Sequence, residues 1–564
     1  MDPAAGTLAC AWALVDELVA GGVRHACLSP GSRSTPLALA LARHPAIELH
    51  VHLDERSSAF VAIGIARSTR RPVVVATTSG TAVAELAPAV VEAWQARVPL
   101  VLLTADRPPR LRGTGANQTI DQVGIFGGHA AYLEPPVAGP TRKAAWSEAG
   151  RTAALVVRRT STPVHLNCPI EEPLVPSGEV ALEPSARPLD PPVEEAPSLG
   201  AADEERLGAE VEGARGVVVV GGTWPVEPVG DLSCLARLGW PVLAEPISGL
   251  RRPGDALAAG QALIGDPGWT EAHPPEVVLQ LGATPTTRAT QAFVAGAARL
   301  LVADRTHPNP DPERRATWRL RADLPAVLAA LERLVEERSP APEGWRATWA
   351  EADARARRAL DRAMDGWDEP FEPRVARDVA AWVPQGGTLF VGNSLPIRDL
   401  DLTMAPRTGL RVVANRGASG IDGLVSTAIG LAAAGRPVVG LLGDLSFVHD
   451  AGALLWNGPR RGPDLVLVVL ANGGGEIFSL LAHEALPEHE ALFRTPHGLD
   501  LGAVCAAAGV GHERVEAAGE LLPALDRAAD AGGLRVVEVA IDAALGRERR
   551  AALRRSVAEA LEGA

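Results

Sequence analysis

Two apolar runs, PVVGLLGD (residues 437–444) and LVLVVLANGGG (residues 465–475), each end in small or oxygen-bearing residues. Such runs predict buried strands of a parallel sheet, whose carboxyl ends meet at one edge. Asp444 and Asn472 then lie side by side, and their oxygens suit Mg²⁺, which is usually shared with substrate phosphates. The runs therefore predict a diphosphate held through a metal ion. The alternative at this point is that Gly443-Asp444 only ends a strand.

The rest of the chain repeats the same alternation of short β-branched runs and helical patterns, which predicts parallel sheets covered by helices. Two proline-rich stretches, 183–200 and 339–344, have the composition of linkers. We expect an α/β protein of three tandem doubly wound parallel-sheet domains, at 1–185, 200–338 and 345–564. A helix is expected at 81–96, and strands are expected at 73–77, 100–104, 216–220, 242–244, 277–281, 300–303, 388–391, 410–413, 438–442 and 465–470.

Composition excludes several classes of protein. The 564 residues carry a formal net charge of −14, so no basic surplus exists to bind nucleic acid or an anionic membrane. Five cysteines without CxxC spacing indicate buried thiols in a reducing compartment. Asp16 and Glu17 interrupt the apolar stretch 8–20, which we interpret as an amphipathic helix and not a signal peptide. We therefore expect a cytoplasmic protein without a membrane-spanning segment.

Two loops of the first segment carry chemically useful side chains. Ser32 and Arg33 precede a helix start at Pro36, where backbone N–H groups favour an anion, although taken alone an ordinary capped turn with a solvated arginine explains them better. A strand at 50–52 runs into Asp54 and Glu55. Asp54 is expected to cap the helix that follows, whereas Glu55 is placed for proton transfer if burial raises its pKa.

Further loops follow predicted strands and share glycine, small polar residues or arginine. In the first segment they are 77–81 and the irregular stretch 106–119. In the third segment they are 392–399 and 415–423. Two glycine-rich loops beside Gly443-Asp444 are stronger evidence for a ligand site than one. The thirteen histidines show no HxxxH or HExxH spacing, and we expect no zinc ligand among them.

Together these loops resemble the thiamine diphosphate (ThDP) enzymes of the decarboxylase group. That group has a pyrimidine-binding domain, a central domain and a diphosphate-binding domain, which the resemblance assigns to the three segments in this order. Its signature is Gly-Asp-Gly followed at a set distance by Asn-Asn. Here the two ends read Gly443-Asp444-Leu445 and Asn472-Gly473, so the third and last positions depart from the signature while the metal-ligand positions are kept.

Within the group the chain is similar to the menaquinone-pathway family of 2-succinyl-5-enolpyruvyl-6-hydroxy-3-cyclohexene-1-carboxylate synthases. The matching stretches are 29–36, 54–66, 105–122, 393–399, 415–422, 443–447 and 477–479. The resemblance implies decarboxylation of 2-oxoglutarate and conjugate addition of the resulting succinyl carbanion equivalent to isochorismate. It also implies a homodimer, or a tetramer, in which Glu55 of one chain meets Asp444 of the other.

The resemblance also implies roles for individual residues. Asp444, Asn472 and the Gly474 carbonyl hold Mg²⁺ or Mn²⁺, and Glu55 is the catalytic residue that bonds the aminopyrimidine. The other cofactor-binding positions are Thr78, Gly80, Gln118, Gly392, Ser394, Ile421, Gly443, Leu445, Ser446, Ile477 and Phe478. The substrate-binding positions are Ser32, Arg33, Arg107, Asn117, Gln118, Ser394, Arg398, Arg416, Ile477 and Phe478. By resemblance, Arg398 and Arg416, with Ser394, engage the acyl donor or the adduct formed from it. Arg33 and Arg107, with Ser32, meet the isochorismate carboxylates.

Two rival interpretations remain open. One is an acetolactate synthase-like or other ThDP-dependent carboligase or decarboxylase, which a flavin in the central domain would favour; residues 217–222 lack the GxGxxG fingerprint. The other is a non-catalytic nucleotide-binding or scaffold protein on the same fold. Joint retention of Glu55, Asp444 and Asn472 argues against the second.

Overall fold

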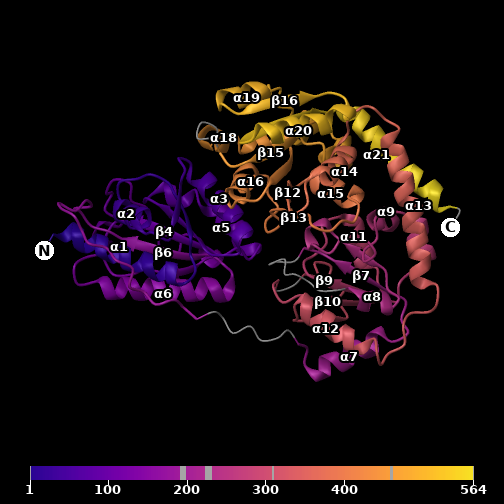
Figure 1. Ribbon diagram of the computed structural model, residues 1–564, viewed down its shortest axis with the longest axis horizontal. Helices are drawn as coiled ribbons and strands as arrows, with labels where there is room; N and C mark the ends of the chain where they lie inside the picture. The colour runs from indigo at the N-terminus through magenta and orange to yellow at the C-terminus, as the bar shows by residue number, and fades with distance from the viewer. Residues whose placement is uncertain (1, 191–197, 223–231, 308–309, 458–461, 563–564) are drawn as a thin grey trace.

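Three parallel sheets follow one another along the chain. The computed structural model describes residues 2–190, 198–222, 232–307, 310–457 and 462–562. The first sheet lies at the left of Figure 1, the second at the lower right and the third at the upper right. Every strand pair within these sheets is parallel, which confirms the predicted fold class.

The first and third sheets share one topology. Their strand orders are β2-β1-β3-β4-β6-β5 and β13-β12-β14-β15-β17-β16, so the strand order reverses between β1 and β3 in one and between β12 and β14 in the other. Ligands bind at such switch points, outside the carboxyl ends of the strands. The strands of the first sheet are β1 His25–Leu28, β2 Glu48–Val51, β3 Val73–Thr77, β4 Leu100–Asp106, β5 Ala131–Leu133 and β6 Val164–Pro169. Those of the third are β12 Thr388–Val391, β13 Arg411–Val413, β14 Val438–Gly443, β15 Leu465–Ala471, β16 Gly511–Val515 and β17 Leu534–Ala540.

Both faces of the first sheet are buried, because alternate residues of its strands enter different cores. Val74 packs with the helices of one face, and Val73 and Val75 pack with those of the other. The first face is covered by α1 Pro3–Ala20, α2 Thr35–Arg43 and α6 Lys143–Thr160. The second is covered by α3 Glu55–Thr69, α4 Thr81–Ala84 and α5 Ala87–Gln95.

The second face of the first sheet shares its core with the third sheet. Helix α3 packs on α16 (Leu424–Ala433), and two glycines allow the approach. A Cβ on Gly64 would lie 2.2 Å from the Thr427 carbonyl oxygen, and one on Gly430 would lie 2.0 Å from that of Val61. The same face of the third sheet carries α17 Asp444–His449, α18 Gly452–Asn457 and α19 Leu501–Ala507. Its other face carries α14 Glu372–Trp382, α15 Leu395–Thr403 and α20 Leu521–Ala531.

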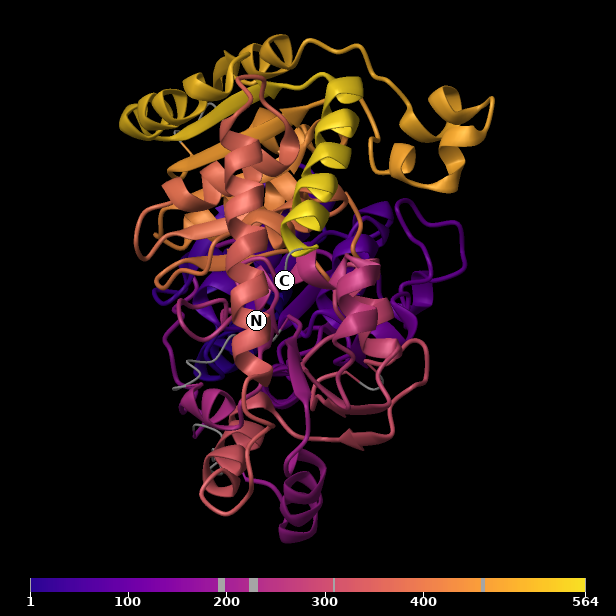
Figure 2. The same ribbon diagram turned by 90° about the vertical axis from the view of Figure 1, so that its right-hand side faces the viewer.

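The second sheet has the order β11-β10-β9-β7-β8 and a core of its own. Two long helices from the last part of the chain, α13 (Trp345–Asp365) and α21 (Ala543–Leu561), run side by side and complete that core (Figure 2). The strands are β7 Gly216–Val220, β8 Val242–Ala244, β9 Val277–Leu281, β10 Arg299–Ala303 and β11 Trp318–Leu320. The helices are α7 Ala201–Val211, α8 Ser233–Arg237, α9 Gly260–Ile264, α10 Pro267–Ala272, α11 Arg288–Ala295 and α12 Leu324–Leu334.

Two helix predictions are wrong in detail. The helix expected at 81–96 is broken into α4 and α5, and Pro88 stands in the first turn of α5. Helix α1 is buried around most of its circumference and is not amphipathic. By length and composition α1 is apolar enough to cross a membrane, but 61% of that stretch is buried inside the protein. Its buried Asp16 is satisfied by the N–H groups of Ser185 and Ala186, as expected of a core helix.

Candidate active site

Asp444 and Asn472 meet at the carboxyl edge of the third sheet, as their spacing predicts. Strand β14 ends at Gly443, α17 begins at Asp444, and the neighbouring β15 ends one residue before Asn472. Oδ2 of Asp444 accepts the N–H of Gly473 at 2.7 Å, and Oδ1 accepts that of Leu445 at 2.7 Å. Burial raises the pKa of Asp444, and these N–H groups and His497 oppose the rise. A divalent cation would offset the cost of this buried charge.

The side chain of Asn472 is held in one orientation, and its oxygen is left without a hydrogen-bond partner. Its Nδ2 donates to Oε1 of Glu372 at 3.0 Å, and its buried Oδ1 has no hydrogen-bond partner. Glu372 is itself buried and lies 3.2 Å from the guanidinium of Arg550, which also donates to Asp399. A buried acceptor without a partner is costly, and a metal ion would satisfy it. The donor set of Asp444 and Asn472 therefore fits Mg²⁺ or Mn²⁺.

The glycines after Asn472 form a tight loop. Gly473 has φ of 79°, and a Cβ on Gly474 would lie 2.4 Å from the carbonyl oxygen of Arg494. Arg494 in turn donates to the carbonyl of Asn472 at 2.9 Å. The predicted third ligand, the Gly474 carbonyl, accepts the N–H of Glu476 at 3.0 Å. A carbonyl oxygen has two lone pairs, so one remains for a metal.

Glu55 begins helix α3, and Asp54 caps that helix by accepting the N–H of Ser57 at 3.0 Å, as predicted. Burial raises the pKa of Glu55, and the negative charges of Asp54 and Glu85 raise it further. A carboxyl group in these surroundings keeps its proton to higher pH, which suits a hydrogen bond to a ring nitrogen.

The N-terminus of α3 lies beside α17 and α18 of the same chain. Arg56 donates to the His449 carbonyl at 3.3 Å, and a Cβ on Gly452 would lie 3.9 Å from Oδ2 of Asp54. Among the described residues, no hydrogen bond or ion pair joins Glu55 to Asp444 or Asn472.

The loops predicted at the switch point of the first sheet also converge. A Cβ on Gly31 would lie 2.3 Å from Cβ of Thr78, and one on Gly80 would lie 2.9 Å from Cγ of Gln118. Gln118 donates to the Ser79 carbonyl at 3.0 Å, and the guanidinium of Arg107 donates to the Ser79 hydroxyl. Thr78, Gly80, Arg107 and Gln118 thus form one wall, and Gln118 is exposed, as are Ser32 and Asn117.

The predicted substrate arginines are partly engaged already. Arg33 is buried and donates to the Ile170 carbonyl at 3.1 Å and to Glu172 at 3.0 Å. Burial lowers the pKa of Arg107, and the positive charge of Arg33 lowers it further. A substrate carboxylate at Arg33 would compete with Glu172, whose side chain is 71% exposed and therefore displaceable.

A second arginine pair stands at the switch point of the third sheet. Arg416 donates to Oδ1 of Asn393 at 3.0 Å, and Arg398 donates to the Ser394 carbonyl. Burial lowers the pKa of Arg398, and Arg416 lowers it further. Ser394 has φ of 71°, an unusual conformation for a residue with a side chain. Two partly buried cations at one switch point favour an anionic ligand.

The remaining predicted positions lie on segments that follow the strands of the third sheet. Gly392 donates its N–H to the Leu441 carbonyl at 2.8 Å, and Ser446 is buried in α17. Ile421, Ile477 and Phe478 are half-buried. Phe478 packs against the glycine loop, because a Cβ on Gly475 would lie 3.0 Å from its ring.

Two domain models of the ThDP enzymes match the chain. The N-terminal thiamine pyrophosphate-binding domain matches residues 9–125, and the C-terminal one matches residues 403–539. The curated 2-succinyl-5-enolpyruvyl-6-hydroxy-3-cyclohexene-1-carboxylate synthase of Thermobifida fusca is 42% identical, over 97% of this chain and 98% of its own. That of Saccharopolyspora erythraea is 41% identical over 98% of each.

This chain belongs to that synthase family. The fold alone is also shared with a crystal structure of benzoylformate decarboxylase from Polynucleobacter necessarius, at a TM-score of 0.71 and 18% identity, over 96% of this chain and 99% of that one.

Several side chains that shape the candidate site were not predicted from the sequence. Glu372 orients Asn472 from a helix 100 residues away. Glu92 of α5 accepts the N–H groups of Gly417 and Ala418, and so fixes the loop of Arg416. Glu245 follows β8; burial raises its pKa, the negative charge of Asp401 raises it further, and Arg416 opposes the rise. No local motif marks these residues, because each acts on a loop far away in the sequence.

Proposed function

We propose that this chain catalyses the ThDP-dependent decarboxylation of 2-oxoglutarate and the addition of the succinyl unit to isochorismate, a step of menaquinone biosynthesis. The observation that carries the proposal is the Asp444–Asn472 pair with its unpaired buried oxygen, in a chain 42% identical to a curated synthase of this name. The paired arginines at both switch points suit substrates rich in carboxylates.

Each group has a role that follows from its surroundings. Asp444, Asn472 and the Gly474 carbonyl hold Mg²⁺ or Mn²⁺, which binds the diphosphate. When bound, ThDP supplies the nucleophilic carbon that attacks the keto group and takes up the electron pair left by CO₂. Glu55 holds a proton against the aminopyrimidine nitrogen. The half-buried Ile421, Ile477 and Phe478 exclude water around that carbon.

One assay separates this function from its rivals. Purified protein should be colourless and should release CO₂ from 2-oxoglutarate only when ThDP and Mg²⁺ are both present, with isochorismate consumed in equal amount. Flavin absorbance and turnover of pyruvate would indicate an acetolactate synthase-like enzyme. No turnover of any 2-oxo acid, with ThDP bound, would indicate the non-catalytic alternative.

The two arginine pairs should divide the substrates between them. Arg→Lys keeps the charge but loses the bidentate fork, which contributes roughly 1.5–3 kcal/mol, or about 10- to 100-fold in affinity. Arg33→Lys should raise the Michaelis constant for isochorismate more than that for 2-oxoglutarate, and Arg398→Lys should do the reverse. The control is Arg527→Lys, at an exposed arginine paired with Glu513. Equal effects on both substrates would contradict this division while leaving the overall reaction intact.

We further propose a homodimer, or a tetramer of such dimers, whose sites combine Glu55 of one chain with Asp444 of the other. The family resemblance supports this assembly. Glu55→Gln and Asp444→Ala chains, each inactive alone, should regain about a quarter of wild-type activity when coexpressed, because half of randomly paired dimers are mixed and each has one intact site. If both residues served a site within one chain, coexpression would restore nothing.

We also propose the limits of the three domains and the cellular location of the protein. Segments 1–185, 200–338 and 345–564 each contain one of the three sheets, which supports their assignment as pyrimidine-binding, central and diphosphate-binding domains. All five cysteines are free and buried, which supports a reducing compartment such as the cytoplasm.

A further inference from the structure

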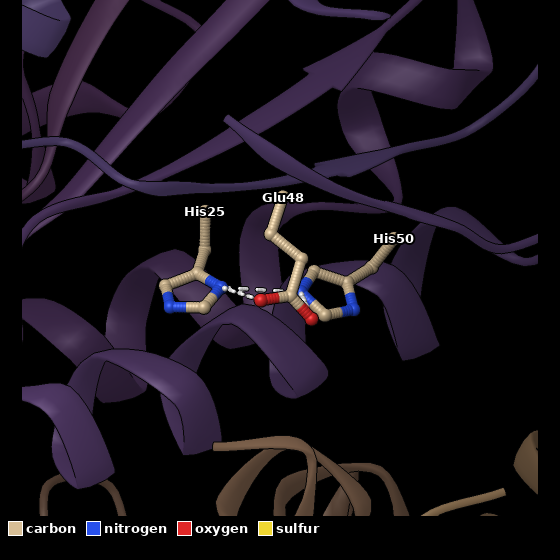
Figure 3. A group of neighbouring side chains, drawn as sticks. All are labelled: His25, Glu48 and His50. Carbon is tan, nitrogen blue, oxygen red and sulfur yellow. Dashed lines mark hydrogen bonds and ion pairs between the residues drawn. The ribbon is translucent and has the colours of Figure 1, made fainter. Parts of the chain in front are cut away.

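Two histidines and a glutamate converge at the edge of the first sheet. His25 is the first residue of β1, and Glu48 and His50 lie on β2, the edge strand. His25 pairs with Glu48 across the two strands, and His50 is two residues further along, so all three side chains leave the same face. Figure 3 shows both rings turned toward the carboxylate between them.

The spacing of the ligand atoms suits a tetrahedral metal ion. Nδ1 of His25 lies 3.3 Å from Nε2 of His50, and these atoms lie 3.6 Å and 3.8 Å from the nearest oxygens of Glu48. Zinc–nitrogen bonds of about 2.0–2.1 Å give ligand–ligand separations of about 3.3–3.4 Å in a tetrahedron. The two imidazole nitrogens thus already stand at the separation of a tetrahedral site. The two Glu48 contacts involve different oxygens, Oε2 and Oε1, and one ligand atom from each of the three residues lies within 4.8 Å of the others.

The surroundings of the cluster also suit a metal. Burial lowers the pKa of both imidazoles, and the charge of Glu48 opposes this. The rings are 15% and 17% exposed, while Glu48 is 61% exposed and leaves an open side for a water ligand. The positive charge of Arg71, which also lowers the pKa of His25, would oppose a bound cation. Arg71 is exposed, so solvent screens its charge.

The cluster is distinct from the site at the switch points. His25 and Glu48 stand at the amino ends of their strands, whereas Glu55 follows the carboxyl end of β2. Strand β2 is only four residues long, and within the part of the chain that the structure describes it pairs only with β1. A metal ion shared by the two strands would therefore fix the edge strand that leads to Asp54 and Glu55.

We propose that His25, Glu48 and His50 bind a divalent ion of the zinc class, with water as the fourth ligand, and that this ion ties β2 to β1. The lack of HxxxH and HExxH spacing gave no hint of such a site, because the two histidines are 25 residues apart and only the strand pairing joins them.

The test uses protein stripped of transition metals and saturated with Mg²⁺ and ThDP, so that the oxygen-rich active site is filled. Titration with Zn²⁺ should show one tight site per chain by calorimetry, and Co²⁺ should give the intense visible absorption of four-coordinate cobalt. His50→Gln and His25→Gln should each weaken binding by at least about 100-fold, since loss of an outer-sphere partner alone costs roughly 10–100-fold. Glu48→Gln, at an exposed side chain, tests the third ligand with little risk to folding.

Stability provides an independent measurement. Zn²⁺ should raise the melting temperature of the wild type and not that of His50→Gln, because a ligand that binds only the folded state stabilises it. His512→Gln is the matched control: it breaks an imidazole–carboxylate pair with Glu538 at 2.8 Å and should keep the zinc effect. No stoichiometric Zn²⁺ binding, or binding unchanged in His25→Gln and His50→Gln, would show that the cluster is only a hydrogen-bonded pair of imidazoles beside a carboxylate.

Discussion

Glu55→Gln is expected to yield a folded protein in which the C2 proton of bound ThDP exchanges with solvent roughly 10²–10⁴-fold more slowly, the usual contribution of a positioned acid or base. Glutamine keeps the size of the side chain but cannot share a proton with the aminopyrimidine nitrogen. Exchange is followed by NMR after acid quench, and turnover should fall with it. Affinity for ThDP should change much less, because the diphosphate is held elsewhere.

The alternative makes Glu55 only an acidic residue at a helix start, worth about 0.3–1 kcal/mol of stability. Under that alternative the exchange rate stays normal, which would contradict the assignment. Glu85→Gln is the matched control, because Glu85 acts on the same carboxyl group by its charge alone. It should leave exchange nearly unchanged at a pH where Glu55 is protonated.

The same substitution has an effect on stability with a defined sign. The pKa of Glu55 is raised in the folded protein, so the folded state binds this proton more tightly than the unfolded chain. The resulting stability is complete below the ordinary pKa of glutamate and is lost as the pH rises through the raised value. Glu55→Gln should remove this slope from the free energy of unfolding measured against pH.

The sequence predicted the central strands well for a physical reason. Strands β3, β7, β9 and β12 are buried on both faces and appear as predominantly apolar runs, so their predicted and observed limits coincide. Strands β5 and β16 lie at sheet edges and carry polar or exposed residues, which hides them from the same criterion.

Some residues of the candidate site were likewise predictable from the sequence, and others were not. Asp444 and Asn472 follow neighbouring strands, so the parallel topology alone brings them together. Asp54 was predictable as a cap because its partner is three residues away. Glu372 and Glu245 are different, because their partners lie on other elements and depend on how the sheets pack. Sequence periodicity contains no information on such contacts.

Asp444→Ala is expected to abolish ThDP binding at Mg²⁺ concentrations that saturate the wild type. The carboxylate is the only formal charge among the three proposed protein ligands, and its loss leaves two neutral oxygens for the metal. Calorimetric titration of ThDP in the presence of Mg²⁺ measures the effect directly. Asp530→Ala, at an exposed position on α20, is the control and should bind ThDP as the wild type does.

Substitution of Glu372, which contacts the site through Asn472, should cause a smaller loss of ThDP affinity than Asp444→Ala. Glu372→Gln leaves one oxygen for two donors, Asn472 and Arg550, so the carboxamide loses its fixed orientation. Affinity for ThDP should fall about 10–100-fold, as for other partners of metal ligands. Raising the Mg²⁺ concentration should restore ThDP binding in Glu372→Gln, because its metal ligands are intact, and should not restore it in Asp444→Ala.

Unchanged ThDP affinity in Asp444→Ala would show that the metal is held elsewhere. The same loss in both variants, without rescue, would mean that Glu372 supports the fold and does not position Asn472.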